Sequence, residues 1–522
     1  MRKSVLLLLA TLFCSYQLIG QYNLHWKRDA ALFNKIGSRS VVDNNDNVIV
    51  TGYYQSENIY TRKYDINGNF LWETVDSSGV QSMYEKPMWI NCDSTGNIFV
   101  IGKRYSIGSS FEYPDAVISM KYNSSGVLLW KNIYPVSVLV GTSIPSLNMR
   151  SEVDSQGNLY IGTVAVTPAG FNLIKYDSNG NQIFVRTDNA YTPRGLSSMR
   201  MKGGKLIISG NGVSSTAPVV SWDTSGTLQW TISAGTASGI DVEIDNSGNW
   251  YKLTSVDNKV SPTSATDVVI VKYNSLGQQI WERGIDMSGY DFPVKFTLVN
   301  DRISGIAYGP VSTSTSPYFD WKTFQLDTAG TLLWDARFNG TIYNDEYPYA
   351  ILAKPNGNVI VAGIGGPSPN PSGSLSYIQM VILEYNNSGS QVWLDTPNVY
   401  GGQALACMLA SDQSLFAISY YNMSVYHYNS TSVGLTSNNV NNKLKSYPNP
   451  TTNTITLEVS ESENNYGSII IHDLSGRSVV EIANPIFENN STTIDIANLK
   501  SGIYIAELIG SNSHAQFKII KQ

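Results

Sequence analysis

The feature that most constrains the fold of this chain is a pattern that recurs along residues 22–430. Its first half is a turn closing in Gly-Asn and then an apolar strand ending in Gly, as in DSTGNIFVIG at 93–102 and KPNGNVIVAG at 354–363. Its second half is an apolar strand ending in Lys-Tyr, a turn closing in Gly, and a strand with Trp, as in KYDINGNFLW at 63–72. Asp or Asn opens such a turn through its side chain, and Gly takes the left-handed conformation before the next strand. The pattern predicts consecutive β-hairpins.

The spacing of these units indicates a β-propeller. The aromatic position of the second half recurs at intervals of 43–59 residues, and each interval holds four predicted strands. In the second unit we expect them at 88–92, 98–104, 116–122 and 128–134. Four strands in about 40–50 residues make one propeller blade. The eight positions are Tyr64, Tyr122, Tyr176, Trp222, Tyr273, Leu326, Tyr385 and Tyr428.

The eighth unit is split between the two ends of the repeat region. It has no Trp strand, because the chain turns polar after Asn429, whereas residues 22–26 are the end of a unit without its beginning. One N-terminal strand therefore completes a blade whose other three strands are C-terminal, which closes the ring and removes exposed sheet edges. We predict eight blades across 21–430. Seven remain possible if the fourth or sixth unit is irregular, and an open solenoid explains the split unit poorly.

Units such as KYDINGNFLW and DSTGNIFVIG resemble the bacterial β-propeller repeat found in exported proteins. The resemblance covers most of residues 22–430 and implies a fold rather than an activity. Three units depart from it. Phe184 replaces Trp in the third unit, Trp222 replaces Tyr in the fourth, and Gln325-Leu326 replaces Lys-Tyr in the sixth. The packing character of these positions is kept, but the blades are not all equivalent.

The N-terminus has the pattern of a signal peptide, predicted at residues 1–20. A basic start is followed by an apolar run that is too short to span a bilayer as a helix. Cys14 raises the alternative of a lipoprotein anchor, although Phe13 stands where lipoprotein signals have a small residue. No later segment is long and apolar enough for a transmembrane helix, so we expect no membrane span after signal removal.

The charge of the chain argues against a nucleic-acid partner. Its formal net charge is -6 over 522 residues, and it contains no run of basic residues. The mature chain has two cysteines, Cys92 and Cys407, each in an apolar strand context. They lie in repeats that are not expected to be neighbours, so we predict two buried free thiols rather than a disulfide.

A different module follows the repeats. Residues 431–446 are polar with little pattern and are expected to form a linker. Residues 447–522 read as a small, Ig-like β-sandwich of short alternating strands. These strands are expected at 454–459, 468–472, 478–482, 492–496, 503–508 and 516–521.

This module resembles the C-terminal sorting domain of type IX secretion cargo. The matching motifs are YPNP at 447–450, IIIHDLSGRSV at 469–479, IANLKSGIYIAEL at 496–508 and FKIIK at 517–521. The resemblance implies that the type IX machinery is a partner in a Gram-negative bacterium. It also implies that the product is either secreted or attached to the outer-membrane surface. An ordinary terminal sandwich with an adhesive function is the alternative.

No residue set in the sequence argues for catalysis, cofactor binding or a metal. His25 and His427 fall on strands of the same predicted blade, where a metal pair is conceivable, but no third ligand is visible. The turns at 43–46 and 65–69 invite a calcium interpretation, yet no acidic residue follows at a fixed spacing, and hairpin turns explain them. There is no Gly-x-Ser-x-Gly elbow for a nucleophilic serine.

Two groups of loop residues remain as candidates. Asp115 and the pair Asp345-Glu346 could act as separated carboxylates of a glycosidase, although loop carboxylates usually face solvent. The Tyr and Trp of the repeat are expected to pack blade against blade. Aromatic residues outside the repeat lie in the longer loops and are better binding candidates. They are Phe111, Tyr113, Tyr318, Phe319 and Tyr347.

The sequence thus indicates an exported, non-enzymatic β-propeller that binds a glycan or a protein outside the cell. A propeller hydrolase or lyase acting on extracellular polysaccharide is the alternative. A structural role in the cell-surface layer or in adhesion is the third reading.

Overall fold

The computed structural model describes most of the chain. The described residues are 22–29, 35–54, 58–107, 112–136, 148–166, 169–191, 193–212, 217–233, 239–257, 259–260, 266–286, 290–310, 319–340, 345–365, 379–397, 404–420, 422–430, 444–459, 466–473, 478–488, 490–510 and 514–522. They form strands and no helix, and so none that could span a membrane. The predicted signal peptide and Cys14 lie outside them. The chain divides into two compact units, 22–430 and the terminal remainder, which are described separately.

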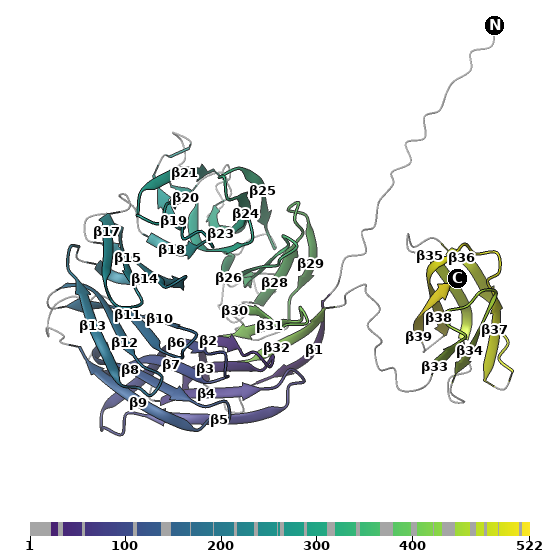
Figure 1. Ribbon diagram of the computed structural model, residues 1–522, viewed down its shortest axis with the longest axis horizontal. Helices are drawn as coiled ribbons and strands as arrows, with labels where there is room; N and C mark the ends of the chain where they lie inside the picture. The colour runs from purple at the N-terminus through teal and green to yellow at the C-terminus, as the bar shows by residue number, and fades with distance from the viewer. Residues whose placement is uncertain are drawn as a thin grey trace, which may run out of the picture. The chain divides into compact units, whose positions relative to one another are not determined.

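Residues 22–430 form eight four-stranded antiparallel sheets, the blades of a propeller (Figure 1). In the first seven blades the strands follow one another in chain order. Blade one contains β2 (Lys35–Val42), β3 (Val48–Tyr54), β4 (Asn58–Tyr64) and β5 (Phe70–Ser77), and blade two contains β6 (Met83–Cys92), β7 (Ile98–Ile107), β8 (Glu112–Tyr122) and β9 (Leu128–Pro135). Blade three contains β10 (Arg150–Val153), β11 (Leu159–Val166), β12 (Ala169–Tyr176) and β13 (Gln182–Asp188), and blade four contains β14 (Pro193–Lys202), β15 (Lys205–Gly212), β16 (Pro218–Asp223) and β17 (Leu228–Ser233). Blade five contains β18 (Gly239–Ile244), β19 (Trp250–Val256), β20 (Asp267–Tyr273) and β21 (Gln279–Ile285), and blade six contains β22 (Phe292–Val299), β23 (Arg302–Pro310), β24 (Phe319–Asp327) and β25 (Leu332–Phe338). Blade seven contains β26 (Tyr347–Ala353), β27 (Val359–Gly365), β28 (Gln379–Tyr385) and β29 (Gln391–Asp395), and blade eight contains β30 (Ala404–Leu409), β31 (Leu415–Ser419), β32 (Val425–Ser430) and the N-terminal β1 (Tyr22–Arg28).

The eighth blade confirms the predicted closure by an N-terminal strand. Its order is β1-β32-β31-β30, so the first strand of the propeller pairs with the last. Leu24 faces Tyr428 and Trp26 faces His427 in this antiparallel pair. The innermost strands of all neighbouring blades touch around the ring, including β30 and β2 across the closure. The fourth and sixth blades are four-stranded like the others, so the count is eight.

The repeated Trp, which was predicted to pack blade against blade, also donates a hydrogen bond to the next blade, and in several blades a Lys does the same. In the first blade, Trp72 Nε1 donates to the main-chain carbonyl of Ser124 at 2.9 Å. Lys63 Nζ donates to the same carbonyl at 3.2 Å. Ser124 belongs to the turn of the second blade that contains Gly126, which has a φ of 84° and lies against the Trp72 ring. Equivalent pairs of donors reach Ser178 from blade two and Thr328 from blade five.

The three irregular units also bond to the next blade, each in a different way. In the third blade Phe184 has no N–H, and the Tyr160 hydroxyl joins Lys175 in donating to the carbonyl of Thr224. In the fourth, Trp230 Nε1 donates to the Ser275 carbonyl at 3.2 Å, and Lys205, which lies on β15 rather than beside the aromatic position, donates to the same carbonyl at 2.7 Å. In the sixth, Gln325 Nε2 donates to the Gly357 carbonyl at 3.0 Å, in the turn between β26 and β27 of blade seven, while Trp334 Nε1 donates to Gln325 Oε1 within its own blade.

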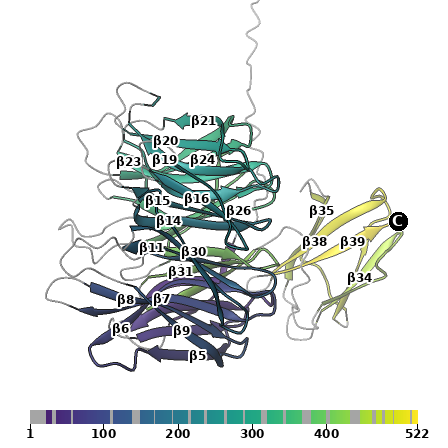
Figure 2. The same ribbon diagram turned by 60° about the vertical axis from the view of Figure 1, so that its left-hand side comes forward.

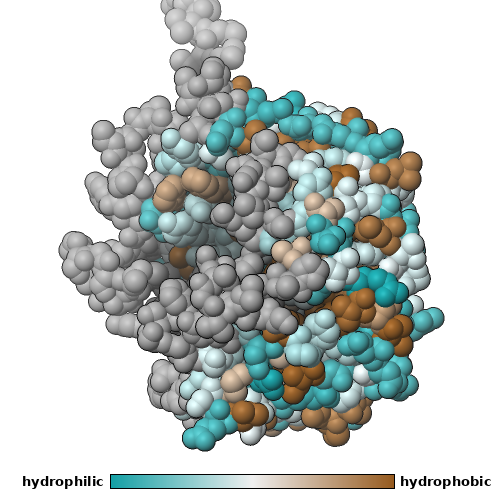
Figure 3. Space-filling view, turned by 90° about the vertical axis from the view of Figure 1, so that its left-hand side faces the viewer, coloured by the Kyte–Doolittle hydropathy of each residue, from teal (hydrophilic) through white to brown (hydrophobic). Residues whose placement is uncertain are grey.

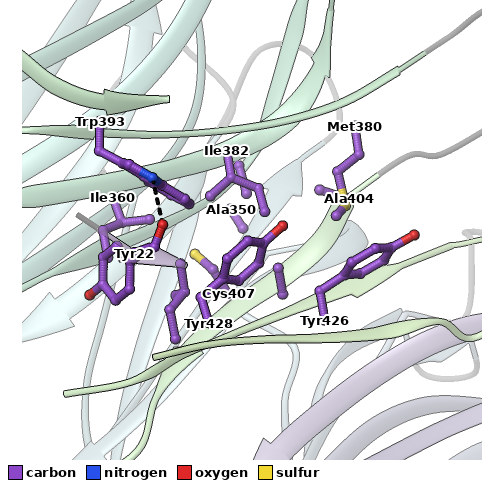
Figure 4. Packing of buried hydrophobic residues seen from close by; sticks show 13 residues of the cluster. Tyr22, Ala350, Ile360, Met380, Ile382, Trp393, Ala404, Cys407, Tyr426 and Tyr428 are labelled. Carbon is purple, nitrogen blue, oxygen red and sulfur yellow. Dashed lines mark hydrogen bonds between the residues drawn. The ribbon is translucent and has the colours of Figure 1, made fainter. Parts of the chain in front are cut away.

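The apolar cores lie between adjacent blades. Figure 4 shows one of them, between blades seven and eight, where Trp393 Nε1 donates to the carbonyl of Tyr22 at 3.1 Å. Tyr22 and Tyr428 lie beside the Trp393 ring with centroid distances of 5.0 and 5.4 Å. A residue of the N-terminal strand thus fills the core of the closure. Cys407 is buried in the same cluster, whereas Cys92 is only partly buried, and both are free thiols.

The two ends of the ring differ in their connections. Tight turns join the first to the second strand of each blade and the third to the fourth strand of blades one to seven. The second-to-third connections and those between blades lie at the opposite end, which we call the loop face. Figure 2 shows the propeller from the side, with the strands of successive blades in layers. On the rim shown in Figure 3, apolar side chains are scattered singly among polar ones, as on ordinary protein surfaces.

The C-terminal unit contains two antiparallel sheets. One has the order β33-β34-β37 and the other β36-β35-β38-β39. Their apolar faces form one core, in which Ile455 and Leu457 of the first sheet meet Ile469, Ile471 and Leu508 of the second. The bounds are β33 (Leu444–Tyr447), β34 (Thr454–Val459), β35 (Tyr466–Asp473), β36 (Ser478–Ala483), β37 (Ser491–Asp495), β38 (Gly502–Gly510) and β39 (His514–Lys521). The predicted small sandwich is present, and its pairing begins at β33, within the segment expected to be a linker.

Candidate functional site

Five aromatic side chains gather at the loop face of blades six and seven. We call them the aromatic cluster: Tyr290, Phe292, Tyr308, Phe319 and Tyr347. The rings of Phe292 and Tyr308, which face each other across β22 and β23, are 5.2 Å apart between centroids. Tyr308 in turn meets Tyr347 edge-on at 5.0 Å. The rings are partly exposed, and Tyr290 has half of its surface in solvent. Large aromatic rings at a surface are typical of ligand and partner sites.

Hydrogen bonds hold the edge of this cluster in place. The backbone N–H of Phe319 donates to Asp345 Oδ1 at 3.0 Å, and the N–H of Glu346 donates to the Phe319 carbonyl at 2.8 Å. The Tyr347 hydroxyl donates to Asp345 Oδ2 at 3.3 Å. Burial, and after it the charge of Asp345, raises the pKa of Tyr347 to about 12. The phenol therefore stays protonated and remains a donor at neutral pH.

A carboxylate-rich group flanks the cluster on the side of blade five. Carboxylate oxygens of Asp267, Asp286 and Asp291 lie within 4.8 Å of one another. Asp286 is exposed, whereas the other two are buried. Asp291, which lies between Tyr290 and Phe292 in the chain, forms an ion pair with Lys322. Asp267 accepts from the backbone N–H of Val260 at 2.7 Å. The buried carboxylates thus have protein partners, and the side chain of Asp286 is the exposed one of the three.

The structure brings together part of the predicted binding and carboxylate residues. Phe319, Tyr347 and the pair Asp345-Glu346 lie in one site. Asp115 lies on another blade, where Arg104 binds it in a bidentate ion pair at 2.8–3.2 Å. Phe111 and Tyr318 lie outside the described residues, as does the side chain of Tyr113.

Sequence reasoning missed Tyr290, Phe292 and Tyr308. Phe292 and Tyr308 fall at strand ends and resemble ordinary apolar strand residues. The sequence offered one signal for this cluster, which is that Tyr290 and Phe292 flank an aspartate where one blade connects to the next.

The two candidate histidines do meet across the closing blade. Their Nδ1 atoms are 3.3 Å apart, and His427 Nε2 lies 2.8 Å from the Ser414 hydroxyl. Burial lowers the pKa of His427 to about 4, and the neighbouring His25 adds to this effect. His427 is stacked on Phe416 with a centroid distance of 4.5 Å. The pair is part of the packing between β1 and β32.

The turns considered for calcium are hydrogen-bonded hairpin turns. Asp43 Oδ1 accepts from the backbone N–H groups of Asn45 and Asn47 at 2.9 and 3.0 Å, and Asp43 Oδ2 is 2.7 Å from Lys63 Nζ. Asp65 Oδ1 accepts from the backbone of Asn67 and Asn69 at 2.9 and 2.8 Å. These carboxylates bond to donors of their own turns, in the pattern of the Asx turn.

The fold and the two units define an eight-bladed β-propeller with a small additional C-terminal β domain. Residues 445–522 match the family described as secretion system C-terminal sorting domain. The chain is therefore a propeller protein that carries a type IX sorting domain, which indicates export from a bacterium to the cell surface or beyond. It also implies recognition by the type IX machinery.

The solved structures that match the chain have little sequence in common with it. "Structure of Dos1 propeller" is 8% identical, with a TM-score of 0.49, and covers 78% of this chain and 95% of its own. An N-terminal BBS1 fragment in complex with ARL6 is 10% identical, with a TM-score of 0.37 and coverage of 80% and 99%. Hsv2p of Kluyveromyces lactis is 10% identical, with a TM-score of 0.37 and coverage of 70% and 98%. A search of curated proteins finds no significant match.

Proposed function

We propose that the protein is a non-enzymatic binding protein that works outside the cell and takes a glycan on the aromatic cluster of its loop face. The observation that carries this proposal is the group of partly exposed rings beside the exposed carboxylates of Asp345 and Asp286. The protein would act either in the medium or on the outer-membrane surface, after delivery by its sorting domain.

The chemistry of the cluster suits a saccharide. A sugar ring has an apolar C–H face, which packs on an aromatic ring, and a rim of hydroxyl groups that need acceptors. Phe319 supplies such a ring, and Asp345 beside it has a carboxylate that is exposed. Because β22, β23, β24 and β26 hold the rings, little conformational entropy is lost on binding. A mostly apolar surface with a few placed polar groups is the usual composition of a small-ligand site.

A polysaccharide-cleaving activity is the second candidate, and the acidic group favours it. Glycosidases use two carboxyl groups close to the scissile bond. Here, however, Asp291 is paired with Lys322 and Asp267 is bonded to Val260, which leaves Asp286 as the exposed carboxylate of the three. A general acid and a nucleophile both need access to the substrate. The geometry therefore supports binding better than cleavage.

A glycan array followed by calorimetry on the best ligands tests this proposal. The variants are Tyr290→Ala and Phe319→Ala, and each is expected to weaken binding by about tenfold or more, because one aromatic contact contributes about 1–3 kcal/mol. Phe70→Ala is the matched control, since Phe70 is an exposed aromatic residue on the outer strand β5.

Each bound glycan is also incubated with the protein and assayed for new reducing ends. Binding without turnover, lost in the two cluster variants and kept in Phe70→Ala, supports the proposal. Turnover would make the protein an enzyme instead. Glycan binding that is equal in all variants would place the site elsewhere.

A further inference from the structure

The innermost strands carry charged residues at one level around the axis of the propeller. In each blade, the aromatic residue of the repeat lies on the third strand and pairs with a residue of the second strand. The residue three positions later on the second strand pairs in turn with a residue of the innermost strand, and this innermost residue is compared between blades. These equivalent residues lie at the same height. In blade order they are Arg39, Trp89, Arg150, Ser198, Asp241, Lys295, Ala350 and Ala406. Three of them are cations and one is an anion.

Two of the cations share one aromatic ring. The guanidinium of Arg39 lies 5.2 Å from the centre of the Trp89 ring, and that of Arg150 lies 4.5 Å from it. Each guanidinium donates from Nη1 to the carbonyl of the preceding residue, Ser38 or Met149, at 2.7 and 3.0 Å. A guanidinium has five N–H donors, and within the described ranges these are the hydrogen bonds that the two side chains donate. Three consecutive blades thus present an Arg–Trp–Arg arrangement at the axis.

Neither arginine has a carboxylate partner among the described residues. In blade four, by contrast, Arg200 has two carboxylate partners, since its Nη2 atom lies 3.1 Å from Glu243 Oε1 and 3.6 Å from Asp241 Oδ1. Asp241 is also committed to the Ser198 hydroxyl at 2.6 Å and to the backbone N–H of Val242 at 3.0 Å. The direct contacts of Asp241 thus lie within blades four and five. Its charge also acts on Arg150 and opposes the lowering of the pKa of Arg150, but it forms no ion pair with Arg39 or Arg150 among the described residues.

The remaining axial groups do not balance the charge either. Lys295 has no ion pair within the described part of the chain, and burial lowers its pKa while Asp241 opposes that effect. Burial, followed by repulsion from Arg39, lowers the pKa of Arg150 to about 10, so it stays charged at neutral pH. Burial raises the pKa of Glu152, on the same strand as Arg150, to about 7. This carboxyl is therefore a weaker counter-charge at neutral pH than an ordinary glutamate.

We propose that Arg39, Trp89 and Arg150, with Lys295 at the same level, form a binding site for an oxyanion at the axis of the propeller. Like charges held together at a partly desolvated position destabilise the fold, and a bound anion offsets that cost. Planar guanidinium groups bind carboxylate, sulfate or phosphate groups through paired N–H donors. All four side chains are partly exposed, so solvent reaches them. The oxyanion is either a free inorganic anion or the acidic group of a saccharide.

Thermal shift and calorimetry on the exported chain test this site, with sodium sulfate and sodium glucuronate as probes. NaCl keeps the ionic strength equal, and glucose is the neutral counterpart of glucuronate. The wild type is expected to show saturable stabilisation by at least one of the two anions and none by glucose. The double variant Arg39→Gln/Arg150→Gln is expected to bind about tenfold or more weakly, because it loses two charged donors.

Two further variants keep the result interpretable. Lys295→Met removes a cation from the far side of the same level and is expected to weaken binding as well, even if the double variant folds poorly. Arg283→Gln, at an exposed position on the outer strand β21, removes one positive charge away from the axis and is expected to bind like the wild type. Sulfate binding alone identifies a free oxyanion, and glucuronate binding identifies an acidic saccharide. No saturable binding, or equal stabilisation of the axial variants and the wild type, would overturn the proposal.

Discussion

The indole N–H of Trp72 in the first blade donates to the main-chain carbonyl of Ser124 in the second blade, at 2.9 Å. This contact belongs to a series, since most blades reach the turn of the next blade with a Trp, a Lys or a substitute for them. The ring is thus held by directional contacts between blades in addition to the apolar cores. Because the contact is made between blades, it stabilises the ring rather than the individual sheet.

Replacing Trp72 with Phe separates the hydrogen bond from the ring packing. Phe keeps a ring in the contact with Gly126 but has no N–H, so the melting temperature should fall by an amount that corresponds to about 1 kcal/mol. Trp72→Ala also removes the ring and should cost about 3–5 kcal/mol. Thermal unfolding monitored by circular dichroism measures both. A Trp72→Phe variant as stable as the wild type would show that the bond adds nothing.

Gly126→Ala should destabilise the propeller for two reasons. The residue has a φ of 84°, which strains any side chain, and an added Cβ would lie 2.7 Å from the Trp72 ring. Gly79→Ala is the matched control, because Gly79 also has positive φ but nothing lies within 4 Å of its Cβ position. The strain common to both is about 1–2 kcal/mol, and the excess in Gly126→Ala measures the contact. Equal losses in the two variants would argue that the ring moves aside freely.

His427 should make the closure of the ring sensitive to acid. Its pKa is about 4 in the folded protein, against 6.5 ordinarily, so on acidification the unfolded chain takes up the proton first. Stability from this group is fully present above pH 6.5 and is lost progressively as the pH falls toward 4. The loss amounts to at most about 3 kcal/mol.

Melting temperatures across this range measure the effect, with His427→Gln as the variant that cannot titrate. The wild type should lose more stability than His427→Gln between pH 6.5 and 4. Parallel curves would contradict this explanation, since other acidic groups titrate equally in both proteins.

Gly309→Ala should disturb the aromatic cluster without touching a ring. An added Cβ would lie 1.8 Å from the carbonyl oxygen of Tyr290, so the backbone before β22 has to move. We expect glycan binding to fall while the melting temperature changes little, because the displaced residue is half exposed. Calorimetry and thermal unfolding on the same variant check both parts. Unchanged binding would mean that Tyr290 is not part of the site.

Deleting residues 447–522 should keep the protein inside the cell. The described core of that unit is its own, so the propeller should still fold. Cell fractions and medium are compared by immunoblot for the full-length and truncated proteins. The complementary chain, a reporter with a signal peptide and the C-terminal unit, should be exported. Truncated protein found in the medium would contradict the sorting role.

The fold was predictable because its determinants are local and repeated. The turn residues and the alternation of strands such as Ile98–Ile107 appear once per unit, so eight weak signals reinforce one another. The closure of the ring could also be predicted, because the strand with Trp26 has no unit of its own and the unit with Tyr428 has no fourth strand. The binding site was predictable only in part. Phe319 and Tyr347 stand out from the repeat, whereas Phe292 and Tyr308 become a cluster only after β22, β23 and β26 are brought together.

The sequence by itself determined the propeller, the way the ring closes and the sorting domain, because each of these is encoded in short segments with fixed spacing. It left seven blades open beside eight, and the four-stranded sheets of the fourth and sixth units decided that number. The tertiary structure decided which side chains share a site. Arg39 and Arg150 are more than 100 residues apart in the chain, yet both lie against Trp89. Contacts across a ring depend on the register and curvature of all its blades, which the order of residues within one blade does not specify.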